Sequence, residues 1–289
     1  MIRTGTIVAA HGRHYEVEDD DGRRWQAVPA GKKSLHACGD RVRIQPAGND
    51  QARILDQLPR SSLLYRSDAH RQKLIAANVG QIVIVTATEP AFSDELVSRA
   101  LVAAEHEGMR AIIVLNKCDL ADLVPAARRQ LAPFAAVGYP VIELSARHDV
   151  GPLLPRLEGA LSVLVGQSGM GKSTLINALV PGAAAATREI SSALDSGKHT
   201  TTHATLHRIP GGPALIDSPG LQEFGLAHLG FGEIEHAFPE FRQTLGQCRF
   251  RDCRHDAEPD CAVKALVKSG VVARRRYEHF RAMTRDRHG

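Results

Sequence analysis

The order of four short motifs is the strongest constraint on the fold of this 289-residue chain. They are NKCD at 116–119, SA at 145–146, GQSGMGKS at 166–173 and DSPG at 217–220. The third has the GxxxxGKS spacing of a phosphate-binding P-loop, which normally precedes the base-reading segments of its domain. Here it follows them, which predicts a circularly permuted P-loop domain. The last motif then runs directly into the C-terminal region.

The phosphate loop stands where its chemistry requires it. The apolar run 161–165 predicts a strand that ends at Gly166, and residues 172–179 have the pattern of a helix. Glycines let backbone N–H groups curl around phosphate oxygens without a Cβ clash, and the helix N-terminus adds partial positive charge. We expect Lys172 to reach the β- and γ-phosphates and Ser173 to ligate Mg²⁺.

Base recognition is predicted at two segments that follow other strands. Asp119 can accept hydrogen bonds from both N1–H and the exocyclic amine of guanine, a pair that adenine does not offer. ATP would leave a buried carboxylate unpaired, and sites of this kind reject such analogues by about 10⁴-fold or more. Ser145 and Ala146 supply a supporting loop. The sequence therefore predicts GTP rather than ATP as the ligand.

The last motif and the loop before it are expected to contact the γ-phosphate and Mg²⁺. Asp217 follows a predicted strand and would hold Mg²⁺ through water, with the Gly220 amide placed for the γ-phosphate. Three consecutive threonines at 200–202 offer hydroxyls between the two phosphate-binding elements. We favour Thr201 as the metal ligand, and the alternative is a merely polar loop.

One substitution indicates how fast GTP would be hydrolysed. Leu221 stands where Ras-like enzymes place the glutamine that orients the attacking water. Slow intrinsic hydrolysis and activation by a partner are therefore expected. His199 and His203 are candidates to position water, and solvent-exposed histidines with no catalytic role are the alternative.

Three of the five cysteines lie with a histidine in the 14 residues from Cys248 to Cys261. Cys248, Cys253, His255 and Cys261 form the ligand set of a closed structural Zn²⁺ site. Such a site would hold together a segment with little core of its own. Buried free thiols are the alternative interpretation, because the spacing differs from the usual CxxC pair.

Charge is unevenly distributed along the chain, whose net charge is +4. Residues 1–70 carry 11 Lys/Arg and 9 Asp/Glu, residues 71–241 carry 13 and 17, and residues 242–289 carry 12 and 6. Basic flanks around an acidic middle favour contact with a polyanion at the flanks. We predict an RNA-facing surface around the cysteine cluster, formed by Arg249, Arg251, Arg254, Lys264, Lys268, Arg274, Arg275 and Arg276.

Three regions of different pattern follow one another. Short β segments in 1–70 predict a small barrel, with an OB-fold favoured over other five-stranded barrels. Continuous β-branched runs in 71–228 predict a buried parallel sheet, and 229–289 turn helical around the cysteines. Residues 59–78 are predicted to be a linker. The expected fold is α/β: a circularly permuted P-loop GTPase domain with an N-terminal OB-fold β-barrel and a C-terminal helical zinc-binding domain.

The rotated motifs, the barrel before them and the C-x4-C-x-H-x5-C module behind them together resemble the RsgA (YjeQ) family of circularly permuted, ribosome small-subunit-dependent GTPases. The resemblance covers nearly the whole chain, and 166–174, 200–202 and 248–263 carry it best. It implies GTP hydrolysis on the 30S subunit and contact with 16S rRNA during late maturation. Within the DSPG motif, Ser218 stands where threonine is commoner in this family. The N-terminal barrel is the part of the chain that resembles the family least distinctly.

The predicted site residues fall into three sets. Lys172, Thr201 and His199 are assigned to catalysis. Ser173 and Thr201 are assigned to Mg²⁺, and the cysteine and histidine cluster to one Zn²⁺. Residues assigned to GTP or GDP are Asn116, Lys117, Asp119, Ser145, Ala146, Gly166, Gln167, Ser168, Gly169, Met170, Gly171, Lys172, Ser173, Thr174, Asp217 and Gly220.

The sequence thus predicts a GTPase that binds 16S rRNA in the 30S subunit and leaves it on hydrolysis. Two alternatives are an RNA-binding assembly factor that uses GTP only as a structural ligand, and a GTPase that serves another translation partner. The N-terminus lacks the apolar core of a signal peptide, and the apolar runs are shorter than the roughly 20 residues of a membrane span. We expect a cytoplasmic monomer that binds neither DNA nor a membrane.

Overall fold

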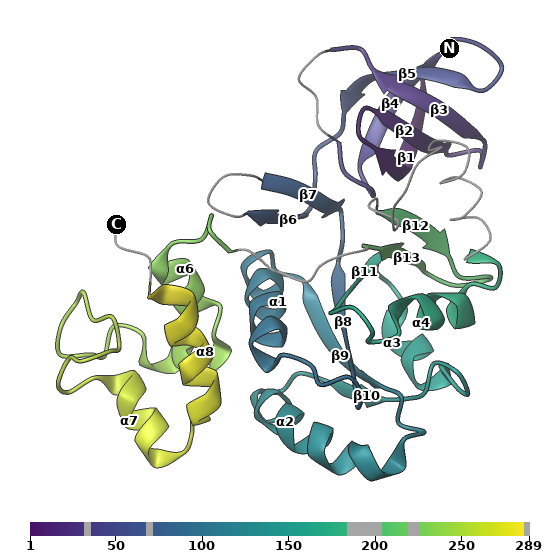
Figure 1. Cartoon of the computed structure of the whole chain (residues 1–289). Coiled ribbons are helices and arrows are strands. Elements are labelled where there is room, and N and C mark those ends of the chain that lie inside the picture. Colours follow the sequence, from purple (N-terminus) through teal and green to yellow (C-terminus); the bar gives the residue numbers. More distant parts are fainter. Residues whose placement is uncertain (32–35, 68–71, 184–203, 219–225, 286–289) are drawn as a thin grey trace.

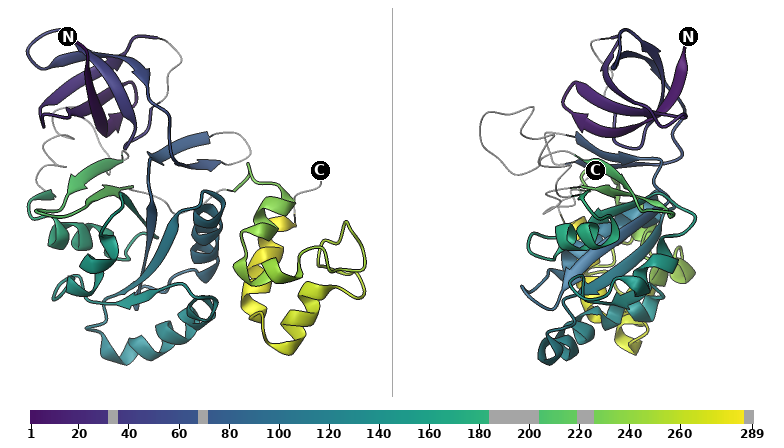
Figure 2. Two further views of the ribbon diagram at one scale, coloured as in Figure 1. Left: turned by 180° about the vertical axis from the view of Figure 1, so that it is seen from behind. Right: turned by 90° about the vertical axis from the view of Figure 1, so that its right-hand side faces the viewer.

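The computed structural model describes residues 1–31, 36–67, 72–183, 204–218 and 226–285. A small barrel lies above a central sheet, and the C-terminal helices lie beside that sheet (Figure 1). The two further views in Figure 2 show the barrel set apart from the helices that flank the sheet. In the part of the chain that is described, no helix combines the length and the apolar character needed to cross a membrane.

The N-terminal region is a closed five-stranded barrel. β1 pairs with both β2 and β4, and β3 pairs with β5, so that the strand order closes on itself. Buried and exposed residues alternate along β3 and β4, as expected when one face of a strand lines a core. The predicted barrel is therefore confirmed. Its strands are β1 (Arg3–His11), β2 (His14–Asp19), β3 (Arg24–Pro29), β4 (Arg41–Pro46) and β5 (Gln51–Gln57).

The predicted linker at 59–78 is wrong, because most of it forms a β-hairpin. β6 (Leu63–Ser67) pairs with β7 (Gln72–Ala77) in antiparallel register. The backbone N–H of Leu63 donates to the Glu107 carboxylate, 44 residues away. Tertiary contacts of this kind order the hairpin, and local sequence does not reveal them. The hairpin also spans the boundary predicted after residue 70.

The central sheet has the order β10–β9–β8–β11–β13–β12. The first five strands are parallel, and β12 is an antiparallel edge strand next to β13. β12 and β13 are antiparallel because a short turn joins them, whereas a parallel pair would need a longer crossover. β12 also pairs with β1 of the barrel. These strands are β8 (Gln81–Ala87), β9 (Arg110–Asn116), β10 (Val141–Glu143), β11 (Ser162–Val165), β12 (Thr205–Arg208) and β13 (Ala214–Asp217).

Helices flank the sheet and position the loops at the carboxyl ends of its strands. β8 and β11 are buried throughout, as a parallel sheet with covered faces requires. The helices of this region are α1 (Asp94–His106), α2 (Val124–Val137), α3 (Leu154–Leu157) and α4 (Lys172–Leu179), with short 3₁₀ helices η1 (Ala121–Leu123) and η2 (Gly151–Leu153).

The C-terminal region packs its own aromatic residues against α1. Phe238, Phe241 and Phe280 are fully buried, and their ring centroids lie 5.1–5.4 Å apart. α1 contacts both α6 and α8, and Phe134 of α2 stacks on His279 of α8, so two helices of the central domain adjoin this region. Its elements are α6 (Phe231–His236), η3 (Pro239–Thr244), α7 (Ala262–Ser269) and α8 (Arg274–Thr284).

Candidate nucleotide and metal sites

The phosphate loop connects the end of β11 to the start of α4. Gly166 has φ +148° and Gly171 has φ +87°, conformations that side-chain-bearing residues rarely adopt. A Cβ at Gly166 would lie 2.2 Å from the carbonyl oxygen of Val85. One at Gly171 would lie 2.3 Å from Nδ2 of Asn116. Both glycines are therefore required by close approach as well as by backbone conformation.

Lys172 and Asp217 face the same side of the site from α4 and β13. Lys172 Nζ donates to the carbonyl oxygens of Gly166 at 2.5 Å and Gln167 at 2.9 Å. Burial lowers the pKa of Lys172 and raises the pKa of Asp217. Each group partly offsets the other's shift by its charge. A triphosphate beside Lys172 and a divalent cation near Asp217 would supply the opposite charge that each buried group lacks.

Asn116 joins the base-reading segments to the phosphate loop. Its Nδ2 donates to the Met170 carbonyl oxygen at 2.9 Å, and its Oδ1 accepts from the Ala146 N–H at 2.9 Å. The side chain is 2% exposed. Asn116 therefore holds three loops in register, and both polar ends of its amide are already occupied by backbone groups.

Asp119 lies at the base-reading end of the site. The neighbouring Ser145 side chain lowers the pKa of its carboxyl, so the ionised acceptor form is favoured. Lys117, between Asn116 and Cys118, has φ +62°, a left-handed conformation that redirects the chain directly after β9. A carboxylate presented in this way can accept the two hydrogen bonds that guanine offers.

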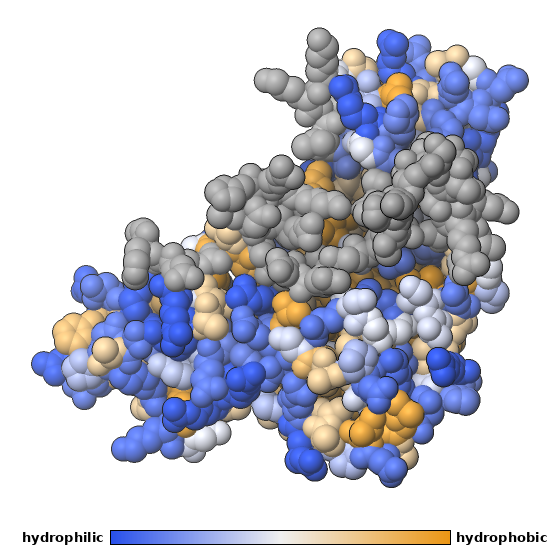
Figure 3. Space-filling model, viewed as in Figure 1, coloured by the Kyte–Doolittle hydropathy of each residue, from blue (hydrophilic) through white to orange (hydrophobic). Residues whose placement is uncertain are grey.

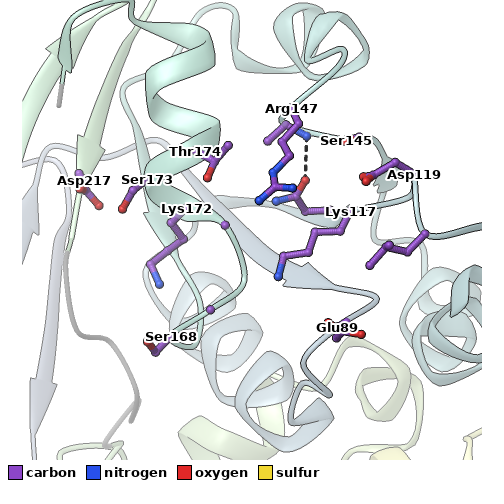
Figure 4. A pocket seen from close by; sticks show the side chains of 15 residues that line it. Glu89, Lys117, Asp119, Ser145, Arg147, Ser168, Lys172, Ser173, Thr174 and Asp217 are labelled. Carbon is purple, nitrogen blue, oxygen red and sulfur yellow. Dashed lines mark hydrogen bonds between the residues drawn. The ribbon is translucent and has the colours of Figure 1, made fainter.

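These elements enclose one pocket of about 640 Å³. Figure 4 shows Lys172, Ser173 and Asp217 at one end of it and Asp119, Ser145 and Arg147 at the other. Three lining residues were not predicted: Glu89, Leu120 and Arg147. Arg147 directly follows the SA motif, which could have suggested it. The predicted residues that line the pocket are Asn116, Lys117, Asp119, Ser145, Ala146, Ser168, Gly169, Gly171, Lys172, Ser173, Thr174 and Asp217.

Three predicted loop residues do not line this pocket. Gly166 packs closely against Val85 of β8. The carbonyl oxygen of Met170 accepts a hydrogen bond from Asn116. Gln167 Oε1 instead accepts a hydrogen bond from the Ser93 N–H at 2.6 Å. Their assignment to the nucleotide stays a prediction that concerns their backbone groups.

Three further predictions lie outside the described residues. They are Thr201 as the Mg²⁺ ligand, His199 and His203 as candidates to position water, and Gly220 as the amide for the γ-phosphate.

The cysteine and histidine cluster brings four donor atoms together, all within 4.8 Å of one another. Cys248 Sγ lies 3.8 Å from Cys261 Sγ, and His255 Nδ1 lies 3.2–3.6 Å from the three sulfurs. Tetrahedral Zn²⁺ with bonds of about 2.3 Å to sulfur and about 2.0–2.1 Å to nitrogen separates its ligand atoms by similar distances. The residues present therefore fit one zinc ion.

Contacts around His255 orient its ring for metal binding. Its Nε2 lies 2.5 Å from Glu235 Oε1, which leaves Nδ1 as the donor to a metal. The Tyr277 hydroxyl donates to the His255 carbonyl oxygen at 2.5 Å. His255 itself has φ +56°, so the loop turns sharply at this ligand. α6 and α8 thus both fix the position of this residue.

The predicted basic surface is only partly exposed. Arg276 is 1% exposed and pairs with Glu240, so its assignment to an RNA-facing surface is wrong. Arg275 is bound to Asp94 on α1. The presence of a basic residue in the sequence of a helix does not reveal that an acidic partner lies on another element. On the face in Figure 3 the C-terminal region is mainly hydrophilic. The exposed residues of the predicted surface are Arg249, Arg251, Arg254, Lys268, Arg274 and Arg275.

Known proteins resemble this chain over almost its full length. The family model described as RsgA GTPase matches residues 57–227. Two curated proteins named small ribosomal subunit biogenesis GTPase RsgA are each 51% identical to this chain and cover 98% of it. One is from Burkholderia pseudomallei (strain K96243), with 91% of its length matched, and the other from Neisseria meningitidis serogroup B (strain ATCC BAA-335 / MC58), with 92% matched.

Two solved structures share the architecture. YjeQ from Thermotoga maritima has a TM-score of 0.76 and 30% sequence identity, and the match covers 98% of this chain and 97% of that one. YloQ, described as a circularly permuted GTPase, has a TM-score of 0.73 and 26% identity, with 100% and 97% covered. With the family model and the curated relatives, these matches show that the chain belongs to the RsgA GTPase family, with a circularly permuted P-loop domain.

Proposed function

We propose that this chain binds GTP with Mg²⁺, hydrolyses it to GDP and phosphate, and acts in late maturation of the small ribosomal subunit. One observation carries the proposal: a single pocket of about 640 Å³ unites a phosphate loop with a base-reading carboxylate, although the two come in rotated order along the chain. The names of the relatives that are 51% identical support the ribosomal partner.

Each end of the pocket has a separate task. Lys172 would bind the β- and γ-phosphates, and Ser173 and Asp217 would hold Mg²⁺. Mg²⁺ supplies positive charge where negative charge develops on the transferred phosphoryl group. At the other end Asp119 accepts from guanine, and the Ser145 loop supports the base. Catalysis would consist mainly of positioning and charge stabilisation.

The switch residues complete the proposed mechanism. Thr201 would ligate Mg²⁺, the Gly220 amide would contact the γ-phosphate, and His199 would position water. These roles rest on the sequence pattern, and on the expectation that the ribosomal subunit stimulates hydrolysis.

We further propose that 16S rRNA is bound by the basic flanks of the molecule and released after hydrolysis. The proposed division is a barrel at 1–70, a GTPase domain at 71–228 and a zinc-binding domain at 229–289. One zinc ion would be held by the four-residue cluster, whose donor atoms fit it. Six exposed basic side chains near that cluster would meet phosphates with salt-sensitive affinity. The chain would act as a cytoplasmic monomer without binding DNA.

The decisive experiment compares GTP turnover by the full-length protein with and without purified 30S, 50S and 70S particles. We expect slow turnover alone and clear stimulation by 30S particles. Lys172→Ala is the control for the pocket, and it should lose the stimulated rate while remaining folded.

Two outcomes would contradict the proposal. Binding of GTP to 30S-associated protein without any turnover would support a structural role for the nucleotide. Stimulation by 50S particles and not by 30S would indicate a different translation partner.

A further inference from the structure

A buried polar cluster joins α8 of the C-terminal region to α1 of the GTPase domain. Arg276 donates to Glu240 Oε1 at 2.8 Å and to Ser98 Oγ at 2.9 Å. Ser98 Oγ also lies 2.7 Å from His279 Nδ1. Arg276, Ser98 and His279 are each at most 2% exposed. Buried polar groups of this kind tolerate little misalignment, because an unpaired member is costly.

The same two helices are joined again at the first residue of α1. Arg275 makes a bidentate pair with Asp94, at 2.7 and 2.8 Å. His279 Nε2 lies 3.4 Å from the same carboxylate. The first two turns of α1 are therefore attached to α8 at both Asp94 and Ser98. A displacement of this end of α1 has to displace α8 or break these contacts.

The N-terminus of α1 is in turn attached to the phosphate loop. Ser93 caps the helix, with its Oγ accepting from the Leu96 N–H at 3.3 Å. Its own N–H donates to Gln167 Oε1 at 2.6 Å. The Gln167 carbonyl oxygen accepts from Lys172 Nζ. Gln167 thus contacts both Lys172, through its carbonyl oxygen, and Ser93, through its side chain.

A small cavity lies beside this junction. It has a volume of about 20 Å³ and is lined by Gln167, Ser93, Val97 and other residues of β8, α1 and β11. Its size corresponds to about one water molecule.

The far side of α8 contacts the cysteine and histidine cluster. The Tyr277 hydroxyl donates to the His255 carbonyl oxygen, and His255 is one of the four donors. An unbroken series of contacts therefore leads from Lys172 through Gln167, α1 and α8 to this cluster. It is separate from the covalent connection that follows Asp217.

We propose that Gln167 is a positioning residue that transmits the nucleotide state of the phosphate loop through α1 to α8 and the cysteine-bearing segment. When the phosphates of a bound guanine nucleotide draw Lys172 away from the carbonyl of Gln167, the side chain that holds Ser93 shifts with it. By linkage, a polyanion bound to the basic C-terminal surface would alter nucleotide affinity by the same factor by which the nucleotide alters affinity for that polyanion. This inference rests on the proposed nucleotide binding.

Hydrogen exchange of the full-length, zinc-loaded protein tests the inference, with and without saturating GDP and Mg²⁺. We expect GDP to slow amide exchange in α1 and α8 by about fivefold or more, the lower end of typical coupling between sites. Gln167→Ala should reduce the α8 response below about twofold, with zinc content unchanged. Gln167→Glu keeps an acceptor for the Ser93 N–H and should retain the response.

Two further variants separate a broken link from a general loss of stability. Ser98→Ala leaves the pair of Asp94 with Arg275 in place, so it should preserve the GDP response of α1 and reduce that of α8 without abolishing it. Gln247→Ala removes a glutamine whose contact lies on an exposed turn, and it should leave both responses unchanged.

Calorimetry in the same samples distinguishes the two ways of failing. A protein that binds no GDP overturns the proposed function and the link together. A protein that binds GDP without any change at α8, or a Gln167→Ala variant with the full α8 response, overturns the link alone.

Discussion

The nucleotide pocket and the cysteine cluster are built in opposite ways. The residues that line the pocket extend from Glu89 to Asp217, and they meet because parallel strands bring their carboxyl ends to one edge of a sheet. The four donors of the cluster lie within residues 248–261. The pocket therefore depends on the core of a whole domain, whereas the cluster depends on a bound ion to hold a short loop.

Burial sharpens this contrast. β8 and β11, which position the pocket, are buried along their whole length. Around the cluster, most residues between the ligands are exposed. A loop with so little core cannot offset its conformational entropy by hydrophobic burial alone. Perturbing the metal should therefore affect structure, and perturbing the pocket should affect chemistry.

The largest expected effect is that of removing zinc. A zinc chelator with a reductant should unfold residues 248–261 and α7, because structural zinc contributes about 10–16 kcal/mol in small zinc domains. GDP affinity should change only by the factor of the coupling proposed above, about fivefold or more. Zinc analysis, limited proteolysis and calorimetry measure these effects. Cys118→Ser, outside the cluster, should keep its zinc, and loss of the central sheet on chelation would contradict the comparison.

Lys172→Ala should lower stimulated GTP turnover by about 10²- to 10³-fold. Loss of one preorganised positive group near developing charge typically has this effect. The variant should keep its zinc and its secondary structure, because among the described residues the hydrogen bonds of Nζ go to carbonyl oxygens of its own loop. Steady-state kinetics with 30S particles and circular dichroism test this. A variant with reduced zinc content would count against the comparison, because the cluster would then need Lys172 to hold its ion.

Asp119→Ala should weaken GDP binding on the order of 100-fold, because two hydrogen bonds to an ionised acceptor are lost. It should also reduce the preference for GTP over ATP, since adenine no longer leaves a carboxylate unpaired. Competition binding with GDP, GTP and ATP measures both changes. Unchanged preference would place base recognition elsewhere in the pocket.

A pair of glycine substitutions separates backbone strain from site assembly. Gly171→Ala places a Cβ 2.3 Å from Asn116 Nδ2, whereas Gly108→Ala, at φ +65°, meets nothing within 4 Å. The first should cost about 1–3 kcal/mol more in unfolding free energy, because displaced Asn116 leaves buried polar groups unpaired. Denaturant unfolding and GDP affinity test this. Equal costs would mean that Asn116 does not hold the loops together.

The smallest effect concerns pH at the junction of α1 and α8. Burial lowers the pKa of His279 below its ordinary value of 6.5, in a site shared with Ser98, Asp94, Arg275 and Arg276. The unfolded chain therefore binds the proton more readily, so stability is lost as pH falls below about 6.5. The slope is at most about 1.4 kcal/mol per pH unit for one group.

His279→Asn should flatten this slope between pH 6.5 and 5.5, as measured by denaturant unfolding at each pH. The comparison is valid only for samples with equal zinc content. An unchanged slope would assign the pH dependence to other groups.

Local patterns predicted the elements well where the signal was itself local. The five barrel strands and the helix of the phosphate loop were expected, because alternation, glycines and an apolar strand end define them without reference to distant residues. The hairpin at 63–77 was missed because its order depends on contacts such as that of Leu63 with Glu107. Arg276 was misplaced for the same reason, since its partners Glu240 and Ser98 belong to other elements.

The sequence by itself determined which chemical groups this protein can use, because the P-loop, the NKCD segment and the cysteine spacing each encode a ligand type in adjacent residues. Only the tertiary structure decided where those groups face. It turned the Asn116 amide onto two backbone loops, turned the Gln167 side chain toward α1, and buried Arg276 between helices. The physical reason is that hydrogen-bond partners far apart along the chain become neighbours only after the sheet and its helices have packed.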